Sequence, residues 1–128
     1  MIYLDTSVAL AHLLAEDRRP PDALWSESLV SSRLLEYEMW VRLHARGLAE
    51  SHGEATRELL SGVALVELVR PVLVRALDSF PVPVRTLDAL HLATVLFLRE
   101  HDSALKVATF DQRMADVSSA LGLELAAL

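Results

Sequence analysis

Four well-separated segments of this 128-residue chain contain acidic side chains that follow short apolar runs or lie near the start of expected helices. They are Asp5, Glu36 together with Glu38, Asp88 and Asp111. Carboxylates that lie close together repel one another unless a cation offsets their charge. Mg²⁺ and Mn²⁺ prefer oxygen ligands of this kind, and such ions activate water for in-line attack on a phosphodiester. If the fold brings these segments together, the acids predict a divalent-metal site that hydrolyses phosphodiester bonds.

The elements that must position these acids alternate along the chain between short apolar segments and helical ones. The expected strands are Ile2–Leu4, Leu29–Ser31, Val63–Val69, Leu105–Thr109 and Leu123–Ala126. The expected helices are Val8–Ala15, Leu34–Arg46, Glu50–Leu60, Val72–Ser79, Thr86–Glu100 and Gln112–Leu121, with a loop over Asp17–Asp22. Short strands that are apolar on both faces are typical of a parallel sheet covered by helices. The sequence thus predicts an α/β fold, a three-layer α/β/α sandwich with a central parallel sheet of four to five short strands.

The acids fall where a parallel sheet binds its ligands, beyond the carboxyl ends of the strands. Asp5 directly follows the first strand, and Asp111 comes shortly after the fourth. Asp88 lies in the first turn of a helix that Thr86 is expected to cap, and the glutamate pair lies early in the helix after the second strand. Taken singly, each acid could instead be a helix cap or a solvated charge. Their joint placement at one edge of the sheet is what favours a site.

Other side chains give weaker signals. His91 shares a helical face with Asp88, and we expect a structural or rim role for it rather than metal binding. Arg42 and Arg46, four residues apart on one helix, could hold a phosphate, although a solvated face is the default interpretation. The aromatic side chains that could stack on bases, but that helical spacing assigns to the core, are Trp25, Tyr37 and Trp40.

Composition and charge exclude several classes of protein. The net charge of −6, from 12 basic and 18 acidic residues, disfavours nucleic-acid binding by bulk attraction but leaves metal-dependent enzymes open. Without cysteine there is no disulfide scaffold, thiolate zinc site or cysteine nucleophile, and no Gly-rich phosphate loop is present. No apolar run suits a membrane span, and no basic leader opens the chain. We expect residues 1–128 to form one cytoplasmic globular domain with no membrane attachment.

Four runs of sequence carry a family resemblance. They are Ile2-Tyr3-Leu4-Asp5-Thr6-Ser7, Ser32-Arg33-Leu34-Leu35-Glu36-Tyr37-Glu38, Leu87-Asp88-Ala89-Leu90-His91-Leu92-Ala93, and Thr109-Phe110-Asp111 with Leu121-Gly122-Leu123. In this order, over nearly the whole chain, they resemble the motifs of the PIN-domain nucleases, and specifically of VapC-type toxins of bacterial toxin–antitoxin pairs. The second run is similar to the family's S-x-L-x-x-x-E segment, which makes Glu38 rather than Glu36 the metal-site glutamate.

The resemblance implies a five-stranded parallel sheet and a Mg²⁺- or Mn²⁺-dependent endoribonuclease. The residues that it implies as catalytic and metal-binding, for one or two ions held directly or through water, are Asp5, Glu38, Asp88 and Asp111. The residues expected to support the site, by orienting a ligand or a water, are Thr6, Thr109 and Glu36. It also implies an RNA substrate, a homodimer, and inhibition by a cognate antitoxin whose C-terminal segment blocks the acidic pocket.

Two other functions fit parts of the pattern. A phosphoryl-accepting receiver-type domain also gathers acids beyond parallel strands, but it pairs them with a lysine. The only lysine here, Lys106, falls inside an expected strand. A catalytically silent PIN-like binding module is expected to lack one of the acids, and none is missing. Metal-dependent cleavage of RNA separates the three functions.

Overall fold

The structure of the chain is a computed structural model that describes residues 1–128. At its centre is a five-stranded parallel sheet with the strand order β3-β2-β1-β4-β5. The strands are β1 (Ile2–Leu4), β2 (Leu29–Ser32), β3 (Val63–Val66), β4 (Lys106–Ala108) and β5 (Glu124–Leu125). This sheet confirms the predicted fold class.

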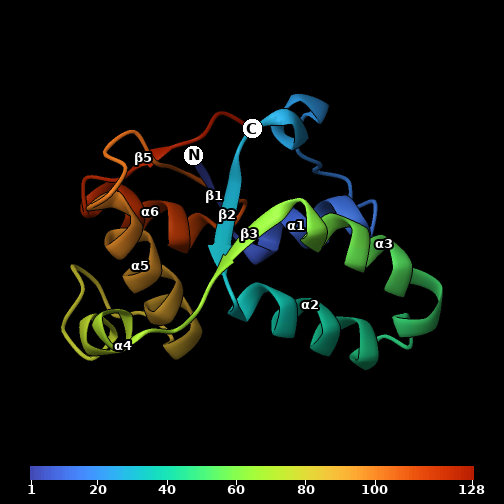
Figure 1. Ribbon diagram of the computed structural model, residues 1–128, viewed down its shortest axis with the longest axis horizontal. Coiled ribbons are helices and arrows are strands. Elements are labelled where there is room, and N and C mark those ends of the chain that lie inside the picture. Colours follow the sequence, from blue (N-terminus) through green and yellow to red (C-terminus); the bar gives the residue numbers. More distant parts are fainter.

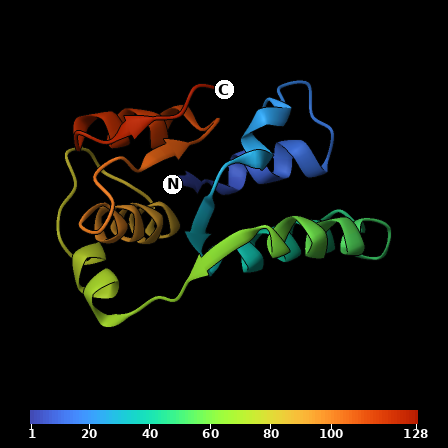
Figure 2. The same ribbon diagram turned by 45° about the horizontal axis from the view of Figure 1, so that its top comes forward.

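Six α-helices and one short 3₁₀-helix surround the sheet. They are α1 (Thr6–Leu13), η1 (Asp22–Ser26, the 3₁₀-helix), α2 (Leu34–Ala45), α3 (Ala49–Ser61), α4 (Arg70–Ala76), α5 (Thr86–Arg99) and α6 (Gln112–Ala120). Figures 1 and 2 show α1, α2 and α3 on one side of the sheet and α5 and α6 on the other. Helix α4 packs against α5. None of these helices combines the length and the apolar character that a bilayer crossing requires.

Successive residues of the central strands point into different parts of the core. Leu4 of β1 belongs to a buried cluster with side chains of α1 and α2, whereas Tyr3 belongs to a second cluster with Val95 of α5. A third cluster joins Leu92 of α5 to Met114 of α6. Both faces of the sheet are therefore buried at its central strands β1 and β2, which explains why these strands are apolar on both faces.

Strand β3 is shorter than its apolar sequence predicts. The expected strand ran over Val63–Val69, but the ladder stops at Val66 because its partner there, Ser32, is the last residue of β2. The next residues lead directly into α4, which carries Pro71 in its first turn. Strand length here is set by the neighbouring strand rather than by local β-propensity.

Helix starts also differ from their expected positions. Helix α1 begins at Thr6 rather than Val8, because the Asp5 side chain caps it. The expected cap of α5, Thr86, is instead its first residue, and Arg85 occupies the cap position without a side-chain bond. Helix η1 lies in a region where no element was expected, since five residues are too few to display a hydrophobic period.

Candidate active site

The four predicted carboxylates meet in one pocket at the carboxyl end of the sheet. This pocket has a volume of about 380 Å³, and its lining includes Asp5, Glu38, Asp88 and Asp111. The four residues come from the end of β1, from α2, from the first turn of α5 and from the start of α6. Glu36 does not line it and instead lies 3.7 Å from the Arg33 guanidinium. The convergence that the sequence predicted is therefore present, without Glu36.

Asp5 is held by residues at the start of α1 and at the end of the neighbouring strand β4. Its carboxylate is buried, and Oδ2 accepts hydrogen bonds from the Ser7 hydroxyl (2.6 Å), the Thr109 hydroxyl (2.8 Å) and the Ser7 amide (3.4 Å). The amide of Asp5 also donates to the carbonyl of Ala108 in β4, at 3.0 Å. All the bonds to the side chain use one oxygen, so Oδ1 keeps no protein partner. Asp5 therefore caps α1 and also lines the acidic pocket.

Asp111 likewise combines two roles. It caps α6, where its Oδ1 accepts hydrogen bonds from the amides of Arg113 (2.9 Å) and Met114 (3.3 Å). Its own amide donates to the Thr109 hydroxyl at 3.0 Å. Thr109 thus connects two of the pocket acids, because the same hydroxyl donates to Asp5. The predicted support from Thr109 has this structural basis.

Ser7 is a part of the site that the sequence interpretation missed. Its hydroxyl donates to Asp5, accepts from the amide of Phe110 at 2.9 Å, and lies 3.3 Å from the Thr109 hydroxyl. It therefore ties the start of α1 to the segment after β4. Its position two residues after Asp5 was a usable signal, because a serine there can bond back to the aspartate that caps its helix.

Glu38 is held through a single oxygen. Its Oε1 accepts a hydrogen bond from the Thr6 hydroxyl at 3.1 Å and another from Nε2 of His91. On its other side, His91 Nδ1 lies 2.6 Å from the phenol oxygen of Tyr3. Burial by itself lowers the pKa of His91, but the hydrogen bond and charge of Glu38, with the charges of Asp5 and Asp88, raise it overall. His91 is fully buried, so it does not lie at the rim of the pocket, and both of its ring nitrogens have protein partners.

Asp88 is the least supported of the four acids. No protein group donates a hydrogen bond to its carboxylate, and it is half-buried. Burial raises its pKa above the usual range, and the charges of Asp111 and Asp5 raise it further. Burial and the neighbouring carboxylates therefore both disfavour the charged form of Asp88.

Two arginines face this acidic pocket. Arg18 and Arg42 both line it, and neither forms an ion pair within the protein. The Arg18 guanidinium lies over the ring of Phe110, 4.5 Å from its centroid. Arg42 is the residue that the sequence suggested as a phosphate contact, whereas Arg18 lies in a segment predicted only as a loop.

Tyr37 differs from its expected core position, since it is 61% exposed on the outer face of α2.

The donor set suits a hard divalent cation. Each of the four carboxylates keeps at least one oxygen without a protein hydrogen bond. Oxygen-only ligands favour Mg²⁺ or Mn²⁺ over softer metals. No three histidine, aspartate or glutamate side chains lie close enough together to bind one ion jointly. An ion would therefore contact one or two carboxylates and reach the others through water, as Mg²⁺ commonly does.

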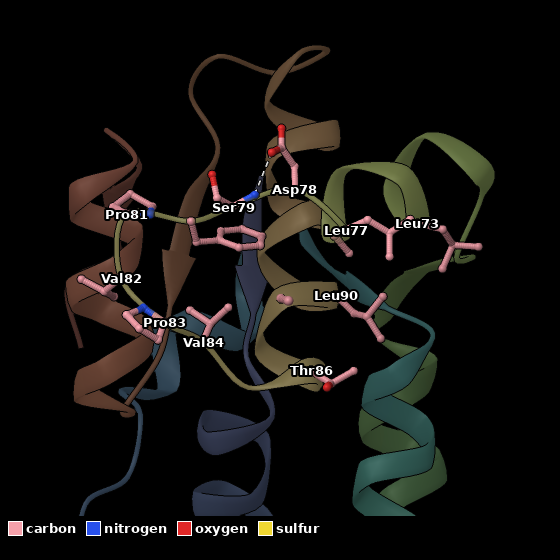
Figure 3. A pocket seen from close by; sticks show the side chains of 13 residues that line it. Leu73, Leu77, Asp78, Ser79, Pro81, Val82, Pro83, Val84, Thr86 and Leu90 are labelled. Carbon is pink, nitrogen blue, oxygen red and sulfur yellow. Dashed lines mark hydrogen bonds between the residues drawn. The ribbon is translucent and has the colours of Figure 1, made fainter.

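A larger cavity lies elsewhere and has a different character. It occupies about 740 Å³ between α4, the segment that follows it and the start of α5. Figure 3 shows Leu73, Leu77, Val84 and Leu90 around it, with Asp78 bonded to the amide of the following residue. Because its lining is mainly apolar and contains a single charged side chain, this cavity has no group suited to phosphodiester chemistry.

Comparison with known proteins identifies the family. The model of the PIN domain matches residues 2–120. The chain is 31% identical over 121 residues to ribonuclease VapC47 of Mycobacterium tuberculosis, covering 89% of this chain and 87% of that relative. It is 35% identical over an alignment of 131 residues to ribonuclease VapC46 of the same species, covering 98% and 96%. A toxin–antitoxin complex from Klebsiella pneumoniae contains a similar fold, with a TM-score of 0.59, 17% identity and 88% of each chain covered. This chain belongs to the PIN-domain family, among the VapC-type ribonucleases.

Proposed function

We propose that residues 1–128 act as one PIN domain, a Mg²⁺- or Mn²⁺-dependent endoribonuclease that serves in the cytoplasm as the toxin of a toxin–antitoxin pair. The observation that carries this proposal is the pocket where Asp5, Glu38, Asp88 and Asp111 meet. Their segments are separated by more than twenty residues of sequence, yet the fold gathers their carboxylates without a basic partner for three of them. Such a concentration of negative charge is costly unless a cation binds there.

Each side chain has a distinct task in this proposal. Asp5 and Asp88 would hold the cation from two elements, with Glu38 and Asp111 reaching it through water. When bound, Mg²⁺ or Mn²⁺ would activate water for in-line attack on the phosphodiester and stabilise the leaving oxygen. Thr6 orients Glu38, and the Thr109 and Ser7 hydroxyls orient Asp5.

RNA must approach a protein whose net charge is −6. Arg18 and Arg42 line the acidic pocket without internal ion pairs, so their guanidinium groups are free to bind the phosphates beside the scissile one. Arg18 packs over the Phe110 ring, which already restricts its side chain. Arg18 therefore loses less conformational freedom when it binds a phosphate. These two arginines attract RNA locally at the site, although the protein as a whole carries a net negative charge.

An antitoxin is the proposed protein partner. The similar fold in the Klebsiella pneumoniae structure comes from a toxin–antitoxin complex, and the curated relatives are VapC ribonucleases. A basic side chain of the antitoxin's C-terminal segment is expected to enter the acidic pocket and offset its charge, in place of the cation. Occupation of the pocket would then exclude RNA.

A second copy of this chain is the other proposed partner. Exposed apolar side chains occur along α4, in the segments on either side of it and at the start of α5, whereas a monomeric protein rarely exposes a large apolar patch. This apolar patch consists of Val69, Leu73, Val74, Leu77, Val82 and Leu87. We propose that it forms the interface of a homodimer.

The acidic pocket contains no lysine, which a phosphoryl-accepting receiver-type domain would need. Lys106 pairs in register with Ile2, at the opposite end of β1 from Asp5, and its amine lies 3.5 Å from Glu124. It is therefore too remote to bind a phosphoryl group on Asp5. A silent binding module remains the second candidate, because all of the site's contacts could also serve RNA binding alone.

The experiment uses antitoxin-free protein and two single-stranded substrates of one sequence, all-RNA and RNA with 2′-deoxy positions. We expect both to be cut in Mg²⁺ or Mn²⁺, because a water nucleophile does not need the 2′-hydroxyl, and the products should carry 5′-phosphates. RNA that is bound but never cut would favour the silent module. Cleavage that requires the 2′-hydroxyl and leaves cyclic phosphates would exclude metal-activated water.

A further inference from the structure

A buried chain of hydrogen bonds runs from the middle of the sheet to the acidic pocket. It starts at the phenol of Tyr3 in β1, passes through both ring nitrogens of His91 in α5, and ends at Oε1 of Glu38 in α2. Tyr3 and His91 are each 1% exposed. The two rings meet edge to face, at 5.9 Å between centroids and an angle of 82°. Three elements that are distant in sequence are thus connected by polar atoms inside an apolar core.

We propose that Tyr3 and His91 are positioning residues, which lock the Glu38 carboxylate so that Oε2 stays available to the metal ion. This inference rests on the proposed metal-dependent function. Oε1 already receives two donors, Thr6 and His91, while Oε2 receives none. A glutamate has three rotatable side-chain bonds, so an unrestrained Glu38 would lose conformational entropy on binding the ion. Fixing one of its oxygens in advance removes much of that cost.

The tyrosine matters because it fixes the histidine. A neutral imidazole carries one N–H, and the partner of one nitrogen decides which form is present. The Tyr3 hydroxyl can donate to Nδ1, which leaves the N–H on Nε2 facing Glu38, and it can equally accept when both nitrogens carry protons. In both cases His91 donates to Glu38. Outer partners of this kind orient metal ligands in proteins.

A purely structural role would make a different prediction. If the chain only filled the core and joined three elements, loss of the Tyr3 hydroxyl would reduce stability and leave metal binding unchanged. Thr94 offers a matched control on the same helix, three residues after His91. It is fully buried, and its hydroxyl donates to the Leu90 carbonyl at 2.8 Å, away from the pocket. Tyr3→Phe and Thr94→Val each remove one buried hydroxyl and almost no volume.

The test measures Mn²⁺ binding to the metal-free, full-length protein by electron paramagnetic resonance of free Mn²⁺, together with the melting temperature in EDTA. We expect Tyr3→Phe to weaken Mn²⁺ binding by about 10-fold or more, within the range for outer partners of metal ligands. Thr94→Val should stay within about twofold of wild type, even where both variants melt at the same lowered temperature. Thr6→Val, which removes the other donor to Oε1, should weaken Mn²⁺ binding as Tyr3→Phe does and gives a second test if Tyr3→Phe fails to fold.

Two outcomes would overturn the inference, and they differ in meaning. If wild type binds Mn²⁺ in a Glu38-dependent manner while Tyr3→Phe and Thr6→Val bind it equally well, the hydrogen-bonded chain is structural only. If wild type binds no Mn²⁺, or Glu38→Gln leaves binding unchanged, the metal site itself is wrong and the positioning role falls with it.

Discussion

Glu36 and Glu38 are two residues apart on α2, yet they have different surroundings. Glu38 lines the acidic pocket, while Glu36 lies beside Arg33 and outside it. We expect Glu38→Gln to lower RNA cleavage on the order of 10²-fold, comparable with losing one group that stabilises charge in a transition state. Glu36→Gln should change the rate by less than about threefold, because an exposed ion pair contributes little. Initial cleavage rates at saturating Mn²⁺ measure both, and equal losses would show that Glu36 also serves the site.

The pH dependence of stability provides a test at Asp88. Its pKa is raised in the folded protein, so the folded state holds this proton more tightly than the unfolded chain. Ionising Asp88 therefore costs folding free energy. This cost is absent below the pKa that Asp88 has in the unfolded chain and grows as pH rises through its pKa in the folded protein. In EDTA, Asp88→Asn should therefore melt at a higher temperature than wild type at pH 7, and the difference should shrink as pH falls below the pKa of an unfolded aspartate. Added Mn²⁺ should stabilise wild type more than the variant, because only an intact site binds it tightly.

Asp102 is the matched control, since its pKa is shifted in the opposite direction from that of Asp88. Its pKa is lowered by a hydrogen bond from the N-terminal amine, 3.2 Å away, and by the amide of Ala104. Its contribution is present at neutral pH and is lost as pH falls through its folded pKa. Asp102→Asn should thus never melt above wild type at pH 7. If Asp88→Asn melts below wild type as Asp102→Asn does, the burial of Asp88 and its repulsion by the other carboxylates are not a significant cost to stability.

Side chains that carry chemistry could be predicted from sequence, and their supporting contacts mostly could not. Asp5 and Asp111 could be placed at one edge of the sheet because each follows a strand, and Asp88 because it lies in the first turn of a helix. Only the family resemblance distinguished Glu38 from Glu36. Tyr3 and His91 are 88 residues apart, and no local pattern signals that their side chains meet. Arg18 lies in an irregular segment, which has no helical or strand periodicity from which the direction of a side chain could be predicted. Tyr37 was misplaced because helical spacing does not reveal which face of α2 is covered.

At the scale of the elements, the start of α6 shows how one residue can be both a cap and a site acid. Asparagine keeps a cap acceptor at Asp111 but removes its charge, whereas alanine removes both. We expect Asp111→Ala to lower the free energy of unfolding in EDTA by about 0.5–2 kcal/mol. Asp111→Asn should unfold at or above the wild-type temperature, yet both variants should lose cleavage. Denaturation in EDTA together with cleavage rates checks this, and equal destabilisation by the two changes would mean that the charge itself is structural.

Helix and strand positions were predictable to within a few residues, because periodicity and Gly or Pro boundaries are local signals. Gly47, for example, follows α2 with φ of 68°, as expected for a residue just past a helix end. The errors occurred where distant parts of the chain decide. Strand β3 ends where its neighbour ends, and α1 starts early because the Asp5 cap is supported by Thr109 from beyond β4.

At the scale of the whole molecule, the apolar patch on and around α4 predicts self-association. Leu77 is 88% exposed and lies within the patch. We expect wild type to scatter light as a dimer at tens of micromolar and Leu77→Glu to scatter as a monomer, because a buried charge would oppose the interface. Leu128→Glu, at an exposed apolar residue outside the patch, should remain dimeric. Monomeric wild type, or a dimer that tolerates Leu77→Glu, would show that the interface lies elsewhere.

The central claim is that this acidic pocket cuts RNA only with a divalent ion bound by its carboxylates. The most direct measurement is the rate of RNA cleavage by antitoxin-free protein, first stripped with EDTA and then titrated with Mn²⁺ or Mg²⁺. We predict no cleavage in EDTA, saturable recovery as either ion is added to wild type, and no recovery for Asp5→Asn. Cleavage that persists in excess EDTA, or that Asp5→Asn retains at the wild-type rate, would contradict the claim.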